Sequence, residues 1–172
     1  MSKQKQKSKR TQSKARDIMS GDVVLAPSTM GIRELANLLT EKRLSGVPVV
    51  DDVGFIVGVV SATDIVSYYS HENKSVKTDL TSQPDFYLRD WNEALESGEL
   101  QQFHIEEYDD PALITEIMTP LVYEVSEEAP LSEIAELMVK GRIHRVIVTN
   151  KGRVSGIVSS LDVLKAVAGS LD

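Results

Sequence analysis

Two serine–aspartate pairs in the chain have the spacing of a small binding or capping motif. Ser61 stands three residues before Asp64, and Ser159 stands three residues before Asp162. Each pair follows an apolar run and opens a helix-forming stretch, so each serine is expected at a helix N-terminus. One interpretation is a capping box, in which serine and aspartate each satisfy a backbone N–H. The other is a binding site. There the serine and the helix N–H groups suit a phosphate, and the carboxylate suits a pair of ribose hydroxyls.

The two pairs recur because the chain contains an internal repeat. Residues 17–66 align with residues 116–164 at an offset of 99, which becomes 98 after one inserted residue near Asp52. Both copies contain an apolar stripe at i, i+3, i+4 and i+7, followed by two apolar runs separated by Gly54 or Gly152. Each copy therefore predicts a short strand, a helix, two strands and a second helix. About 50 residues bury too little apolar surface to be secure alone, so the copies are expected to pack together.

These features resemble the CBS domain, the cystathionine-beta-synthase-type repeat, and the pair of copies resembles a Bateman module. The resemblance covers about three-fifths of the chain. It rests on the Asp/Glu-Ile-Met start of each copy, on the Ser-Gly-Val-Pro-Val-Val strand from Ser45, and on the endings Gly58–Ile65 and Gly156–Val163. The sequence thus predicts an α+β fold of two β-α-β-β-α CBS repeats related by a pseudo-twofold axis. The predicted repeats span residues 17–70 and 113–172, with an inserted segment at 71–112.

The resemblance implies that adenosine-type ligands bind in clefts between the repeats: AMP, ADP, ATP or S-adenosylmethionine. Asp64 and Asp162 would then hold the ribose, next to Ser61 and Ser159. The other candidates are Val23 and Val122 as walls of the base pocket, with Val47, Pro48 and Val146 on the strands whose backbone would contact the adenine edge. The second copy departs from the family pattern here, because its strand has no proline at the position of Pro48. The resemblance further implies a regulatory role and a homodimer with four repeats in a flat disc.

A cluster of basic residues distinguishes the second copy from the first. Arg142, His144 and Arg145 precede its central strand, where the first copy has Arg43 and no other basic residue. The cluster is similar to a stretch in the gamma subunit of AMP-activated kinase whose His-Arg pair contacts phosphate. By that analogy His144 and Arg145 are candidate phosphate ligands, and Arg142 is a secondary one. The structural alternative is a solvated helix end, where the helix dipole favours cations.

The insert at 71–112 is acidic and rich in aromatic residues. Residues 71–110 hold 11 acids and three bases, and seven of the nine aromatic residues lie between Tyr68 and Tyr108. Aromatic residues are unusual in disordered linkers, so part of the insert should be ordered, with a helix expected over Phe86–Ser97. Three interpretations remain open. The aromatic residues could pack on the repeats, or the insert could be a partner-docking surface or a lid over one cleft. It could also bind a hard cation through His104, Glu106, Glu107, Asp109 and Asp110.

The composition excludes several classes of function. The 172 residues include no cysteine, which rules out disulfides, zinc thiolates, iron–sulfur clusters and thiol catalysis. No apolar run is long enough to cross a bilayer. There is no phosphate-binding loop ending in Lys-Ser/Thr, no G-x-S-x-G and no H-E-x-x-H. The expectation is a cytoplasmic, non-enzymatic protein with no metal.

The net charge of −7 combines two opposite parts. Residues 1–16 contain seven Lys/Arg and no acid, so the remaining residues carry 12 bases and 26 acids. The tail is expected to be a disordered, solvated arm; binding to nucleic acid or anionic lipid and folding back on the acidic remainder are the alternatives. The leading hypothesis is an adenine-nucleotide sensor that changes conformation and acts on an unknown protein partner. The rival is a dimerisation scaffold that binds its partner through the aromatic insert. Neither nucleic acid nor a membrane is expected as a partner.

Overall fold

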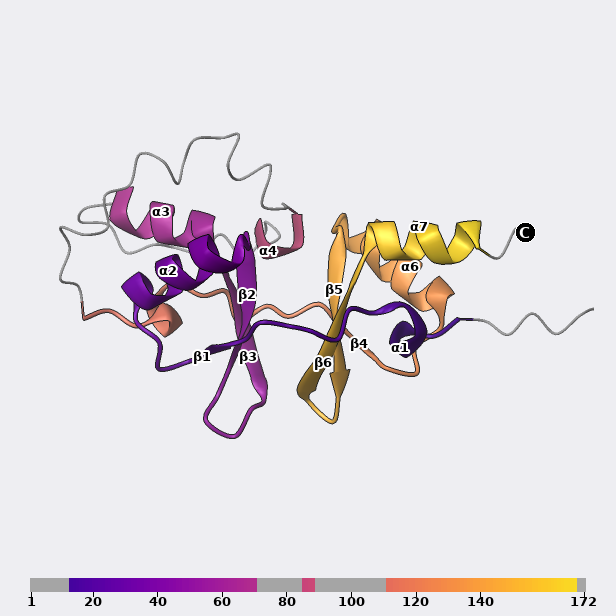
Figure 1. The fold of residues 1–172 in the computed structure, drawn as a ribbon, viewed down its shortest axis with the longest axis horizontal. Coiled ribbons are helices and arrows are strands. Elements are labelled where there is room, and N and C mark those ends of the chain that lie inside the picture. Colours follow the sequence, from indigo (N-terminus) through magenta and orange to yellow (C-terminus); the bar gives the residue numbers. More distant parts are fainter. Residues whose placement is uncertain (1–12, 71–84, 89–110, 170–172) are drawn as a thin grey trace, which may run out of the picture.

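The described part of the chain folds as two copies of one unit (Figure 1). The computed structural model describes residues 13–70, 85–88 and 111–169. The first copy, repeat 1, consists of β1 (Ala26–Pro27), α2 (Ile32–Lys42), β2 (Gly46–Val50), β3 (Ile56–Ser61) and α3 (Ala62–Ser70). The second copy, repeat 2, consists of β4 (Glu124–Ser126), α6 (Leu131–Gly141), β5 (Arg145–Asn150), β6 (Arg153–Ser159) and α7 (Ser160–Ala168). The predicted α+β fold with two β-α-β-β-α repeats is confirmed.

Each repeat contains one three-stranded sheet with the same topology. β1 pairs with β2 in parallel, and β2 pairs with β3 antiparallel; β4, β5 and β6 repeat this order. Gly46 pairs with Ser61 in the first sheet, and Arg145 pairs with Ser159 at the equivalent position of the second. This register brings the start of each central strand next to the serine that opens the last helix. The sequence-distant halves of the candidate site are therefore joined by strand pairing.

The predicted apolar stripes pack helices α2 and α6 onto their sheets. Ile32 and Ile134 are fully buried, as are the central residues of β2 and β5. Each helix ends at an arginine in the left-handed conformation, Arg43 with φ 54° and Arg142 with φ 52°. The N–H of each arginine donates to carbonyls of the last helical turn, which closes the helix. Arg43 and Arg142 therefore occupy the same C-cap position in the two repeats.

The segments that precede the two repeats are exchanged between them. Helix α1 (Ala15–Ile18) docks on repeat 2, where the fully buried Ala15 donates its N–H to the carbonyl of Ala129 at 2.9 Å. The 3-10 helix η2 (Ile114–Glu116) docks on repeat 1, where Ile114 donates to Met30 at 2.9 Å. Both segments then reach the opposite sheet through isolated bridges, Ser20 with Ile157 and Thr119 with Val59. These contacts are equivalent by the repeat offset, as a pseudo-twofold arrangement requires.

Two boundaries predicted from the sequence do not coincide with the packing. The expected end of the basic tail at residue 16 lies inside α1, and Lys14 and Arg16 form ion pairs with Glu128. The expected end of the insert at residue 112 lies inside the repeat-1 core, since Ala112 is only 6% exposed there. Sequence similarity marks the repeated unit, whereas packing follows the exchanged segments. Lys14 and Arg16 therefore contact an acidic residue of the same chain, which is what the fold-back alternative for the tail proposed. Residues 1–12 of the tail lie outside the described part.

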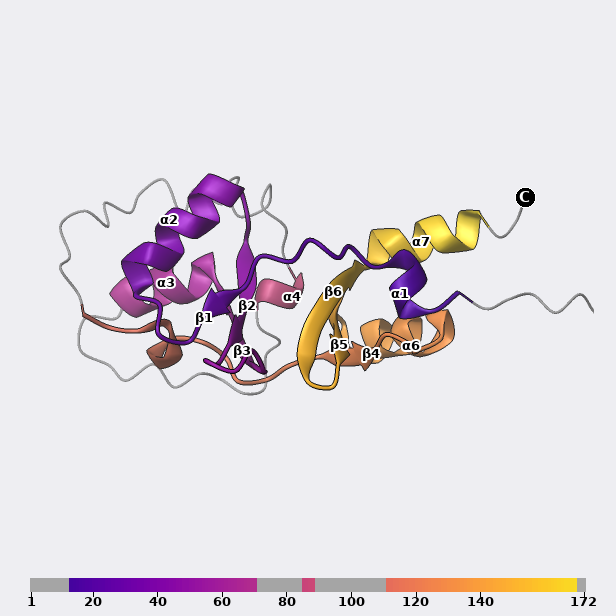
Figure 2. The same cartoon turned by 60° about the horizontal axis from the view of Figure 1, so that its bottom comes forward.

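A short helix from the insert, α4 (Asp85–Leu88), lies between the two repeats in both views (Figures 1 and 2). It packs against β2 and β3 of repeat 1 and against β5 of repeat 2. Phe86 and Tyr87 are buried, at 1% and 0% exposure. Two of the insert's aromatic residues therefore pack on the repeats, as one interpretation predicted. Residues 89–97 of the predicted helix and the candidate cation ligands His104–Asp110 lie outside the described residues.

Candidate functional site

Both serine–aspartate pairs form the same capping box at the start of the last helix of their repeat. Ser159 donates from its hydroxyl to Oδ2 of Asp162 at 2.6 Å and from its backbone N–H to the same oxygen at 2.9 Å. The backbone N–H of Asp162 donates to the Ser159 hydroxyl at 3.2 Å. Ser61 and Asp64 repeat these contacts at 2.7, 2.7 and 3.4 Å. The capping-box interpretation of the motif is therefore confirmed in both repeats.

A cleft of about 590 Å³ opens beside the capping box of repeat 2. This repeat-2 cleft lies within the usual size range of small-molecule sites, about 300–1,000 Å³. Its lining comes from four parts of the chain: the segment after α1, the end of α4, the start of β5, and β6 with the first turns of α7. The lining residues are Ser20, Leu88, His144, Arg145, Ile157, Ser159, Ser160, Leu161, Asp162 and Lys165.

The repeat-2 cleft combines one carboxylate with several groups that suit an anion. Asp162 sits in the first turn of α7 with its side chain 21% exposed, so a ligand can reach it. Lys165 lies one turn later, with its Nζ 3.6 Å from Oδ1 of Asp162. Arg145 and His144 come from the start of β5, and the Arg145 guanidinium also lies 5.5 Å from the centroid of the Phe86 ring. A ligand with hydroxyl donors at one end and negative charge at the other matches this set.

Four of the predicted site residues therefore meet in this cleft: Ser159, Asp162, His144 and Arg145. Arg142 is not among the lining residues, because it forms the exposed C-cap of α6. Val146 is fully buried in the core of repeat 2, and Val122 packs against the same core. Val23 is half-buried in the segment between α1 and β1, where its N–H donates to the Gly21 carbonyl.

The predicted site residues of repeat 1 are arranged differently. Ser61 is only 1% exposed, and Asp64 remains partly exposed in its capping box. Val47 and Pro48 are buried in β2, where they pair with Val60 and Val59 of β3. Their side chains are therefore covered by the surrounding protein, and only their backbone atoms could contact a ligand.

Sequence reasoning did not name six of the lining residues: Ile157, Ser160 and Leu161, which adjoin the predicted Ser159 and Asp162, and Ser20, Leu88 and Lys165. Ser20 arrives from the segment before repeat 1, because that segment is exchanged onto β6. Leu88 arrives from the insert, through the docking of α4. Lys165 could have been found from the sequence, since a basic residue three positions after an aspartate shares its helix face. Ser20 and Leu88 could not, because only the tertiary packing brings them to β6 and β5.

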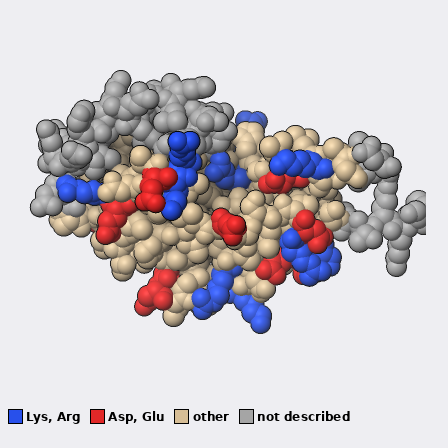
Figure 3. Space-filling view, viewed as in Figure 1, with Lys and Arg blue, Asp and Glu red and all other residues tan. Residues whose placement is uncertain are grey.

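Charge is mixed over the described surface. On the face shown in Figure 3, acidic and basic side chains alternate across both repeats. Within the described ranges, no group of three or more His, Cys, Asp or Glu side chains is placed to hold a metal ion. Among the described helices, none combines the length and apolar character that a bilayer crossing needs.

Comparisons with known proteins agree with the two-repeat fold. A family model for the CBS domain matches residues 15–71 and 114–169. The chain is 30% identical over 145 residues to the chloroplastic CBS domain-containing protein CBSX2 of Arabidopsis thaliana, covering 83% of this chain and 57% of that protein. It is 26% identical over 153 residues to the uncharacterized protein MJ1426 of Methanocaldococcus jannaschii, covering 88% of this chain and 89% of that protein. The chain therefore spans little more than half the length of CBSX2.

Solved structures share the two-repeat arrangement. The crystal structure of CBSX2 in complex with AMP has a TM-score of 0.62 at 20% identity, covering 92% of this chain and 98% of that chain. The CBS domain pair of protein MJ0100, in complex with 5'-methylthioadenosine and S-adenosyl-L-methionine, has a TM-score of 0.58 at 26% identity, with coverage of 92% and 98%. With both repeats matched in order and folded as a pair, the chain belongs to the CBS-domain family.

Proposed function

We propose that the protein is a regulatory module that binds an adenosine-type ligand in the repeat-2 cleft. The observation that carries the proposal is the joining of Asp162 with Arg145, His144 and Lys165 around one cleft of suitable size. Support also comes from the MJ0100 domain pair, 26% identical, which is bound to two adenosine derivatives. AMP, ADP, ATP and S-adenosylmethionine are the candidate ligands.

The chemistry of the cleft fits a nucleoside monophosphate. A ribose diol offers two O–H donors, and the Asp162 carboxylate is an acceptor with one oxygen, Oδ1, outside the capping bonds. The phosphate would be neutralised by Arg145 and Lys165, with the Ser160 end of α7 contributing a favourable dipole. Ile157 supplies an apolar surface on β6 for the base. The roles assigned to these groups are those of ligand recognition, and recognition is what we propose for the cleft.

Binding would act as a signal because the cleft is shared by exchanged segments. Ser20 comes from the segment before repeat 1, whereas Asp162 and Lys165 belong to repeat 2. A ligand that contacts both stabilises the arrangement in which they lie together and shifts the population toward it. A protein partner that reads this arrangement would then respond to the ligand concentration. The homodimer remains a prediction, which analytical ultracentrifugation can test. Helix α7 has an exposed apolar face that a second copy could contact, formed by Leu161, Leu164 and Val167.

Calorimetry with AMP, ADP, ATP and S-adenosylmethionine, on protein freed of nucleotide, tests the proposal. Asp162→Asn should weaken the best ligand roughly 10- to 150-fold, since hydrogen bonds to a charged group are worth about 1.5–3 kcal/mol. Lys165→Ala should weaken the phosphate-bearing ligands and spare S-adenosylmethionine. Absence of heat with all four ligands would refute the adenosine proposal.

The scaffold alternative is less favoured by the described residues. Its anchors were to be the aromatic residues of the insert, and Phe86 and Tyr87 are buried inside the chain. Those two side chains are therefore engaged by the repeats, where a partner protein cannot reach them. The choice is tested by the same calorimetry, because a scaffold would bind none of the ligands.

A further inference from the structure

The pseudo-twofold axis relates the repeat-2 cleft to an equivalent set of residues in repeat 1, which we call the repeat-1 site. This site consists of Thr119, Gly46, Val59, Ser61 and Asp64. Their counterparts in repeat 2 are, in the same order, Ser20, Arg145, Ile157, Ser159 and Asp162. The two sets differ sharply in exposure. In repeat 1, Val59, Ser61 and Thr119 are 0%, 1% and 6% exposed. In repeat 2, their counterparts are partly or fully exposed. Equivalent backbone positions are therefore covered in one repeat and open in the other.

Phe86 of α4 is a side chain that covers the repeat-1 site. A Cβ placed on Gly46 would lie 3.2 Å from Cδ2 of Phe86, so the ring rests directly on the backbone at residue 46. The same Cβ would lie 2.6 Å from the carbonyl oxygen of Val60, which leaves no room for a side chain. The equivalent position in repeat 2 is Arg145, a candidate phosphate ligand. Glycine thus removes the basic group from the repeat-1 site and admits an aromatic ring instead.

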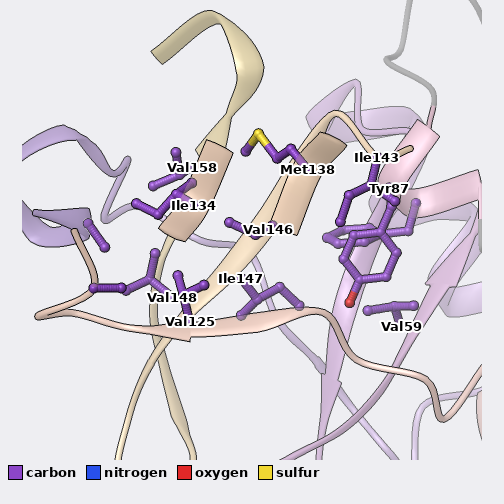
Figure 4. Packing of buried hydrophobic residues seen from close by; sticks show 13 residues of the cluster. Val59, Tyr87, Val125, Ile134, Met138, Ile143, Val146, Ile147, Val148 and Val158 are labelled. Carbon is purple, nitrogen blue, oxygen red and sulfur yellow. The ribbon is translucent and has the colours of Figure 1, made fainter. Parts of the chain in front are cut away.

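Tyr87 anchors α4 to repeat 2 by hydrogen bonds and contributes to a core cluster that includes Val59 of repeat 1. Its carbonyl accepts the backbone N–H of His144 at 2.9 Å, and its hydroxyl accepts the N–H of Tyr123 at 2.8 Å. Its ring packs edge-to-face on Phe86 and on Tyr123, with centroids 4.9 and 5.0 Å apart. Figure 4 shows the Tyr87 ring between Val59 of β3 and the residues around Ile143. Helix α4 is therefore packed between the two repeats, with Tyr87 buried there.

We infer that Asp85–Leu88 is a built-in occupant of the repeat-1 site, so that each chain takes one adenosine ligand, in the repeat-2 cleft. Phe86 supplies the apolar surface that a base would otherwise offer to Val59 and Gly46. The count of one ligand rests on the proposed function, whereas the occupancy by Phe86 does not. The insert thereby makes two repeats of the same topology functionally unequal.

Arg145 contacts both sites, and this determines which measurement can report the opening of the repeat-1 site. Its guanidinium lies over the Phe86 ring and also lines the repeat-2 cleft. Removing the ring therefore changes the surroundings of a proposed ligand group in the other site. Stoichiometry and dependence on Asp64 report the opening of the repeat-1 site, whereas the affinity of the repeat-2 cleft does not.

Calorimetry with AMP on the full chain tests the count. We expect about one AMP per chain in the wild type, bound roughly 10- to 150-fold more weakly in Asp162→Asn, and a second AMP in Phe86→Ala. The second AMP should disappear when Asp64→Asn is added to Phe86→Ala. The two aspartates are matched, since each caps its own helix in the same way. Two AMP molecules on the wild type, or wild-type binding that Asp64→Asn weakens, would overturn the inference even if Phe86→Ala fails to fold.

A nuclear Overhauser effect tests the occupancy without any nucleotide. Protons of the Phe86 ring should show a cross-peak to the Hα atoms of Gly46 in ligand-free protein. Its absence would overturn the inference directly. If the cross-peak is present but AMP does not bind, the built-in occupant stands and the proposed function fails. If AMP binds and the cross-peak is absent, the proposed function stands and the occupant fails.

Discussion

The hydroxyl of Tyr87 is the most direct test of how the insert docks. Tyr87→Phe keeps the ring, which is fully buried, and removes only the oxygen that accepts the Tyr123 N–H at 2.8 Å. A buried donor left without its acceptor costs about 1–3 kcal/mol. Tyr123 is itself half-buried, so water can relieve part of that loss and we expect about 1–2 kcal/mol. For a chain of this size the corresponding fall in Tm is about 2–8 °C.

Tyr123→Phe is the matched control for this experiment. It retains the backbone N–H and the edge-to-face contact with Tyr87, so its free energy of unfolding should stay within about 0.5 kcal/mol of the wild type. Urea unfolding followed by circular dichroism measures both variants. Equal stability of Tyr87→Phe and Tyr123→Phe would refute the docking geometry of α4, because the hydroxyl would then have no structural partner.

The same tyrosine predicts an alkaline signature. Burial is the main cause that raises the pKa of Tyr87 well above its ordinary value. A raised pKa in the folded state means that the stabilising contribution is complete below about pH 10, where both states are neutral, and is lost as the pH rises further. The urea midpoint of the wild type should therefore be steady up to about pH 10, the ordinary tyrosine pKa, and should fall as the pH rises above it. The fall should be shallower in Tyr87→Phe, and parallel curves would contradict the burial.

Two further predictions concern the contacts between the repeats. The hydrogen bond from Lys14 is the main cause that lowers the pKa of Glu128, so docking of α1 should be complete at neutral pH and weaken as the pH falls through that lowered pKa. Amide-exchange protection of α1 measures this docking, and Glu128→Gln should remove its pH dependence. Equal protection of α1 in acid and at neutral pH would contradict the prediction. Gly58→Ala places a Cβ 2.7 Å from the carbonyl oxygen of Thr119 and should cost about 1–3 kcal/mol of unfolding free energy. Gly21→Ala is the control, since its nearest neighbour would be 3.9 Å away, and an equal urea midpoint for the two variants would refute the close approach.

The repeat made most of the fold predictable. Strand and helix positions follow from periodicities that occur twice, and the indel near Asp52 falls in the hairpin between β2 and β3 as expected. The capping boxes also follow from sequence, because Ser159 and Asp162 lie one helical turn apart. These features depend on residues close together in the chain, which is why local patterns suffice to find them.

The exchange of segments could not be read in the same way. Similarity places the Asp-Ile-Met start in repeat 1, yet α1 packs on repeat 2 and Ser20 pairs with Ile157. An internal repeat makes both partners equally suitable for each segment, so pattern alone cannot choose between docking within a repeat and docking across the pair. Packing of the two units decides it.

The sequence by itself determined the two repeats, their element order and the chemical groups at the start of each last helix. Only the tertiary structure decided that these two sets of groups are unequal. The sequence places Gly46 in the predicted strand, but no pattern links it to Phe86, which lies 40 residues further along the chain and touches it. Such a contact depends on how the insert returns between the sheets, and the stability it provides comes from burial that no local pattern records.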